Sequence, residues 1–203
     1  MRPRTAGQCT LFRFLLACTT LGLVASWALP GHGAAAPRAR SIQSGRQVGQ
    51  KIPSFYVRAV TGPLRNKSVC YVCRNGSRPC VMILFRKLEP GLTPLLKQID
   101  RQVDRNRASG LKGFGVLISP QPSQAISKLQ TLSFNNKIRL PLTVGTNAVS
   151  APSCQNVHPE ATVTVVLYHR QRVIQTYAFR SGQLTASNTK AILAGVRRLL
   201  DKS

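Results

Sequence analysis

The chain has 203 residues, which is enough for one domain of ordinary size together with a processing segment. Its hydrophobic fraction of 43% can form a real core, so the composition excludes a wholly disordered chain. There are 29 Lys and Arg residues against 5 Asp and Glu, giving a formal net charge of +24. We therefore expect attraction to anionic surfaces. So few carboxylates, with no pair spaced for acid–base work, argue against a carboxylate-based hydrolase and against hard-cation sites.

Residues 1–35 have the pattern of an export signal. Three arginines precede an uncharged stretch from Phe14 to Leu29, and Gly33-Ala34-Ala35 offers a small-residue cleavage site. The uncharged stretch is shorter than the roughly 20 apolar residues of a membrane-spanning helix. We therefore favour a cleaved signal, with an uncleaved membrane anchor as the alternative. Either interpretation predicts an exported protein, periplasmic or secreted.

Residues 36–47 lack hydrophobic periodicity and indicate a flexible linker, so we place the folded domain at residues 48–203. The basic residues are scattered from Arg38 to Lys202 and are not interleaved with aromatic residues. Nucleic-acid binders cluster their cations or place them beside aromatic side chains. We therefore favour an anionic envelope surface over nucleic acid as a contact of the positive charge.

From Val48 onward, strand patterns alternate with helix patterns. An apparent hairpin around the six-residue loop 74–79 comes first, and a second hairpin precedes the last helix. Leucine and isoleucine spacing predicts three amphipathic helices. The expected strands are 68–73, 80–86, 114–118, 140–144, 162–168 and 173–179. The expected helices have their apolar faces at 92–103, 125–132 and 192–200, and the last one has Thr185 or Ser187 as its candidate cap. This order predicts an α/β domain, in which a mixed sheet has helices on both faces.

The order of elements resembles the thioredoxin-like superfamily, in the redoxin branch of alkyl hydroperoxide reductase-like and exported thioredoxin-like proteins. Three segments carry the resemblance: the opening from Val48 to Gly62, the run Cys80–Phe85, and Leu140-Pro141-Leu142 followed by the second hairpin. The resemblance covers residues 48–203. It implies a thioredoxin-like central mixed sheet flanked by helices, and the apparent first hairpin would be an extra N-terminal β-hairpin.

The chain departs from this family where the family keeps its chemistry. The resemblance implies a redox or peroxidatic cysteine just after the strand that ends at Phe85, where the start of a helix favours the thiolate. Residues 86–93 contain no cysteine, and Thr162 stands near the place of the proline expected before the second hairpin. We therefore expect no typical peroxiredoxin activity. Glu89 would occupy this helix start, and only Cys154 is a candidate to reach it through the fold.

Four cysteines follow the signal, and Cys70 and Cys73 form a CxxC pair. We predict these two as the catalytic thiols of a thiol–disulfide reaction, with Cys70 the more exposed and Cys73 resolving. A bond between them requires a turn, because residues three apart in a strand are roughly 10 Å apart. A structural Cys73–Cys80 disulfide across the apparent hairpin is the competing interpretation, with Cys154 as a further disulfide candidate.

The same four cysteines, with His158 or His169 as substitutes, form an alternative thiolate metal site for zinc or Cu(I). We favour no metal and no cofactor. The sequence thus predicts an exported thioredoxin-like domain with a degenerate family site, a thiol–disulfide role through Cys70 and Cys73, and a protein thiol partner. The alternatives are a non-catalytic envelope-binding module with structural disulfides, and a metal-binding protein.

Overall fold

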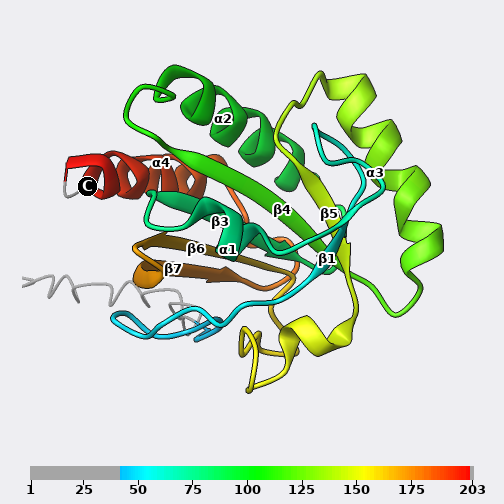
Figure 1. Cartoon of the computed structure of the whole chain (residues 1–203). Helices are drawn as coiled ribbons and strands as arrows, with labels where there is room; N and C mark the ends of the chain where they lie inside the picture. The colour runs from blue at the N-terminus through cyan, green and yellow to red at the C-terminus, as the bar shows by residue number, and fades with distance from the viewer. Residues whose placement is uncertain (1–41, 202–203) are drawn as a thin grey trace, which may run out of the picture. The chain divides into compact units, whose positions relative to one another are not determined.

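A mixed sheet of seven strands organises residues 42–201, the part of the chain that the computed structural model describes (Figure 1). The strand order is β2-β1-β5-β4-β3-β6-β7. Strands β3, β4 and β5 are parallel, while β1, β2, β6 and β7 pair antiparallel with their neighbours. The strands are β1 (Val57–Ala59), β2 (Ser68–Val69), β3 (Cys80–Phe85), β4 (Lys112–Ile118), β5 (Leu142–Gly145), β6 (Val163–His169) and β7 (Arg172–Phe179).

Three long helices and two short ones accompany these strands within residues 42–201. They are α1 (Tyr71–Asn75), α2 (Leu92–Arg105), α3 (Pro122–Asn136), the 3-10 helix η1 (Asn147–Ser150) and α4 (Ala186–Asp201). Helices α2 and α3 are the crossovers that make β3, β4 and β5 parallel. The apolar spacing of α2 buries Leu92, Leu95, Leu96 and Ile99 along one face.

Strand β3 lies at the centre of the sheet, and all six of its residues are buried. Alternate side chains point to opposite faces of a sheet, so β3 contributes to two cores. Ile83 and the other β3 side chains that point the same way pack with α2, α3 and α4 on one face. Met82 and the β3 side chains that point the opposite way from Ile83 pack on the other face, with residues of α1, η1 and the irregular segments around them. The expected helices on both faces are therefore unequal, since the second face has only short ones.

The predicted α/β fold with a thioredoxin-like mixed sheet is confirmed, and so is the second hairpin, formed by β6 and β7. The predicted pairing of 68–73 with 80–86 is wrong. Strand β2 ends at Val69 and pairs with β1, whereas β3 lies between β4 and β6. The chain leaves the sheet at Cys70 because Cys70 caps the start of α1. The N-terminal hairpin is thus made by β1 and β2.

The prediction of a flexible linker is wrong for residues 42–47, because they pack on the domain. The Ser44 hydroxyl is hydrogen-bonded to the Thr164 hydroxyl at 2.7 Å, and the Gly45 N–H donates to the Asn156 carbonyl at 2.9 Å. The predicted signal and residues 36–41 of the predicted linker lie outside the described residues. Within residues 42–201, no helix has both the length and the apolar character needed to cross a membrane.

Candidate functional site: the Cys70–Cys73 disulfide

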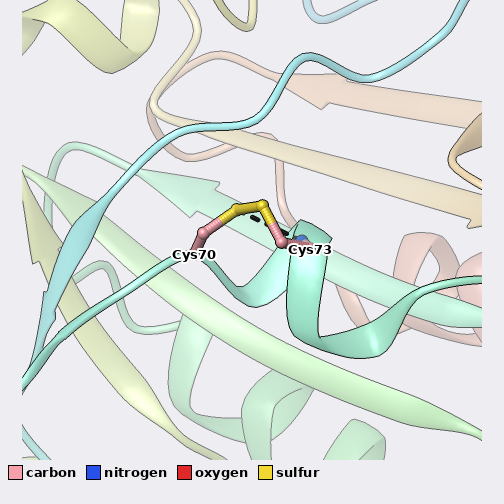
Figure 2. The surroundings of a disulfide bond; sticks show 2 residues. All are labelled: Cys70 and Cys73. Carbon is pink, nitrogen blue, oxygen red and sulfur yellow. Dashed lines mark hydrogen bonds between the residues drawn. A yellow bond between two sulfur atoms is a disulfide. The ribbon is translucent and has the colours of Figure 1, made fainter.

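A disulfide joins Cys70 to Cys73 at the start of α1, as Figure 2 shows. Cys70 has extended backbone angles, and the first turn of α1 then brings the two Cα atoms to 5.4 Å. This distance lies inside the range that a disulfide allows. The turn required for a Cys70–Cys73 bond is therefore present. The competing interpretation, a structural Cys73–Cys80 disulfide, is wrong, because Cys80 and Cys154 are free thiols.

The two linked cysteines differ in their exposure to solvent. Cys70 is 6% exposed, whereas Cys73 belongs to the exposed residues. This is the reverse of the order expected from the sequence. Buried Cys70 also receives a hydrogen bond, since the Cys73 N–H donates to the Cys70 Sγ at 3.2 Å. An attacking thiol therefore meets Cys73 first, while the sulfur it would release is the one with a hydrogen-bond donor.

Helix α1 is held against the sheet by its apolar side chains. Val72 is fully buried, and the Tyr71 ring stacks on the Phe114 ring of β4 with a centroid distance of 5.0 Å. The helix ends at Gly76, whose φ of 58° favours glycine. The stacked Tyr71 and buried Val72 fix the position of the disulfide, so it rests on a packed support.

Free Cys80 lies under this helix at the start of β3. The Asn75 side-chain amide donates to its Sγ at 3.2 Å, and Tyr168 of β6 is its partner across the sheet. Burial raises the pKa of the Cys80 thiol to about 12, and the Asn75 hydrogen bond only partly offsets that effect. A neutral, fully buried thiol is a poor nucleophile. Cys80 is thus a core residue that is linked to α1 through Asn75.

Cys154, the other free thiol, lies half-buried in the loop between η1 and β6. Its carbonyl accepts a hydrogen bond from the Arg46 Nε at 2.7 Å. Burial raises the pKa of its thiol, with Gln155 and Arg46 acting in the opposite direction. Cys154 packs against the core on the opposite face of the sheet from α2. It therefore does not supply the sulfur missing at the start of α2.

The alternative metal site on Cys70, Cys73, Cys80 and Cys154 is not assembled. Across residues 42–201, no three His, Cys, Asp or Glu side chains lie close enough together to hold a metal ion. The disulfide also uses two of the four proposed thiolate ligands. Both observations disfavour the proposed tetrahedral thiolate site in this oxidised form.

At the start of α2, where the resemblance implies a reactive cysteine, the side chains are different. Gly91 is the N-cap residue, and buried Glu89 accepts a hydrogen bond from the Gly182 N–H at 3.2 Å. Thr162 precedes β6, and none of the peptide bonds in residues 42–201 is cis. This position thus holds a carboxylate, and the CxxC pair lies before β3, where the sequence pattern suggested a strand.

One sequence signal could have located α1. Cys70 and Cys73 are separated by about one helical turn, and Asn75-Gly76 is a typical helix end. Read as helix signals, these residues predict a short helix ending at the Asn-Gly pair. The hairpin interpretation instead makes residues 74–79 a loop between two strands, so that Cys70 and Cys73 fall in the first strand.

Comparison with known proteins finds similarity in structure alone. No sequence family matches the chain, and no curated protein matches it. A putative thiol:disulfide interchange protein DsbE from Chlorobium tepidum has a TM-score of 0.57 at 11% identity, covering 76% of this chain and 98% of that one. A putative protein disulfide isomerase from Bacteroides thetaiotaomicron has a TM-score of 0.56 at 12% identity, covering 77% and 95%.

Peroxiredoxins are also among the similar structures. The yeast mitochondrial 1-Cys peroxiredoxin has a TM-score of 0.57 at 12% identity, covering 77% of this chain and 78% of that one. At such low identity the similarity establishes the fold, and the resemblance read from the sequence is confirmed at that level. The chain has the thioredoxin-like fold of redoxin proteins, with a CxxC disulfide at Cys70 and Cys73.

Proposed function

We propose that the protein is an exported thiol–disulfide oxidoreductase that uses Cys70 and Cys73 as its redox pair. The observation that carries this proposal is the difference between the two sulfurs. Exposed Cys73 is open to attack, and buried Cys70 accepts the Cys73 N–H. Hydrogen bonding to a thiolate favours the charged form and makes it a better leaving group.

The exchange step follows from this arrangement. A partner thiolate attacks the Cys73 Sγ, a partner–Cys73 disulfide forms, and the Cys70–Cys73 bond breaks with the electron pair on the Cys70 Sγ. A second thiolate of the partner then attacks its own sulfur in the mixed disulfide and releases Cys73. The partner dithiol loses two electrons and the CxxC pair gains them. The reverse sequence reduces a partner disulfide.

A structural role for the disulfide is the competing function. The short loop that the disulfide closes argues against this role. Cys70 and Cys73 are separated by three positions. The chain-entropy relation gives about 2 kcal/mol for so small a loop, against about 4.7 kcal/mol for a loop of 100 residues. Helix α1 is already held by Tyr71 and Val72. The bond therefore contributes little to the stability of the fold, which favours a redox role.

The partner we propose is an acidic protein thiol. Exposed Arg74 and Arg78 follow Cys73, and the Arg170 N–H donates to the Ser77 carbonyl at 3.3 Å, which brings the β6–β7 turn to the same edge. In residues 42–201, none of these three arginines forms an ion pair. Positive charge beside an exchange site raises the encounter rate with acidic partners. The same edge would meet an anionic envelope surface.

The test is the equilibrium of the Cys70–Cys73 bond in glutathione and dithiothreitol redox buffers, followed by alkylation and mass spectrometry. We expect reversible reduction of this bond in the folded protein. Cys73→Ser and Cys70→Ser should abolish exchange with a model dithiol peptide, whereas Cys154→Ser, a matched loss of one thiol, should leave it unchanged. A bond that opens only when the protein unfolds would contradict the redox proposal and favour the structural role.

Export is the second part of the proposal and rests on residues 1–35. Mass spectrometry of protein from the envelope fraction of the producing cell is the measurement. We expect a mature chain that begins near Ala36, and an intact N-terminus would instead indicate the anchored form. Recovery of the full chain in the cytoplasm alone would contradict export.

A further inference from the structure

A pocket of about 360 Å³ lies at the carboxyl ends of β3 and β4, beside the start of α3. Ligands of open α/β sheets bind outside the carboxyl ends of the strands. The volume lies within the range of small-molecule sites. The polar residues lining this pocket are Arg86, Lys87, Ser119, Gln121, Gln124 and Lys128.

The charge of this pocket is uniformly positive. Three of the lining residues are cations, and no residue lining the pocket is acidic. The nearest acid along the chain, Glu89, accepts a hydrogen bond from Gly182. None of the ion pairs formed within residues 42–201 involves Arg86, Lys87 or Lys128. The positive charge of the pocket is therefore not neutralised by a salt bridge.

The Arg86 guanidinium is incompletely hydrogen-bonded within the protein. Its Nε is buried and has no hydrogen-bond acceptor among residues 42–201, while other atoms of the side chain line the pocket. A buried donor without an acceptor costs about 1–3 kcal/mol, more when the group is charged. Ser119 adds a second donor, because its Oγ already accepts the Gln121 N–H and its proton remains available. An oxyanion in the pocket could accept hydrogen bonds from Ser119 and from the Arg86 nitrogens other than the buried Nε.

We propose that this pocket binds the phosphate group of a small molecule. Arg presents a planar fork of donors that matches a phosphate, and the two lysines supply the second positive charge that a dianion requires. The pocket is also lined by Leu88, Leu117 and Ala125. These side chains suit an apolar part attached to the phosphate. The site is separate from the Cys70–Cys73 disulfide and does not depend on the proposed redox activity.

Calorimetric titration of the full-length protein with phenyl phosphate and with inorganic phosphate tests this proposal. Both titrations are run at one fixed ionic strength set with chloride, because a protein of net charge +24 attracts any anion. We expect saturable one-site binding, tighter for phenyl phosphate because of its apolar ring. Arg86→Gln should weaken binding at least about 10-fold, the effect of losing one charge-assisted hydrogen bond.

Two further variants keep the test decisive if Arg86→Gln folds poorly. Lys128→Gln changes a residue on the exposed side of α3 and should weaken binding about 3- to 10-fold. Lys97→Gln on α2 removes the same charge outside the pocket and should leave the affinity unchanged. Equal affinities in Lys128→Gln and Lys97→Gln, or titrations that never saturate, would overturn the proposal and indicate general attraction of anions.

Discussion

The segments on either side of β3 differ in the chemistry that they carry. Before β3, residues 70–79 hold a disulfide, a short helix and an aromatic stack. After β3, residues 86–91 hold cations, a buried carboxylate and the close-packed start of α2. The fold accommodates a helix start at both places. Sulfur is present at one of them and absent from the other, so the fold alone does not determine where its chemistry lies.

The largest stability effect is expected before β3, from Tyr71→Ala. This change removes a buried ring that stacks on Phe114 at 5.0 Å and carries α1. We expect a loss of about 3–5 kcal/mol in the free energy of unfolding, measured by urea denaturation. Arg74→Ala, an exposed neighbour, should cost less than about 1 kcal/mol. Equal losses would show that α1 is not held by this stack.

After β3, a much smaller change, Gly91→Ala, should also destabilise the protein. A Cβ added at Gly91 would clash with the Leu184 carbonyl oxygen, which is backbone and cannot move aside cheaply. We expect a loss of about 1–3 kcal/mol, typical of overpacking. Thermal and urea unfolding measure this loss, with Lys87→Ala as an exposed neighbour that should change stability by less than about 0.5 kcal/mol. An unchanged stability for Gly91→Ala would show that this helix start is loosely packed.

How far the sequence predicts each segment depends on the range of its interactions. Continuous apolar residues predicted β3, and leucine spacing predicted α2, because burial dictates both patterns. Helix α1 was missed because it has five residues, and its position depends on Tyr71 stacking on Phe114, 43 positions away in the chain. No local pattern encodes such a contact. Likewise, no local pattern encodes the contacts that hold residues 42–47 against the sheet.

The buried thiol at the start of β3 should make the protein sensitive to alkaline pH. The pKa of Cys80 is raised from 9.0 to about 12 in the folded protein, mainly by burial. Above pH 9 the unfolded chain therefore releases a proton that the folded protein retains. Stability should fall by about 1.4 kcal/mol per pH unit from this group between pH 9 and its folded pKa.

Cys80→Ala removes this dependence and serves as the comparison. Urea denaturation from pH 8 to pH 11 should give a shallower alkaline decline for the variant, while other groups such as Tyr168, whose pKa is also raised by burial, still contribute. Parallel curves for the two proteins would show that solvent reaches Cys80 in the folded state. No thiol follows β3 within residues 86–91, so this pH dependence arises at the start of the strand and has no counterpart after it.

The smallest expected effect separates the ring of Tyr71 from its hydroxyl. The Tyr71 hydroxyl is buried and has no hydrogen-bond partner among residues 42–201, so its removal breaks no hydrogen bond. Tyr71→Phe keeps the stack on Phe114 and removes an unpaired polar group. We expect stability equal to that of the parent protein or higher by up to about 1 kcal/mol, and unchanged rates of thiol–disulfide exchange.

A loss above about 1 kcal/mol would mean that the hydroxyl has an acceptor, such as a buried water. A slower exchange at unchanged stability would instead place the hydroxyl in the reaction at Cys70 and Cys73. The packed support of the disulfide would then also take part in its chemistry.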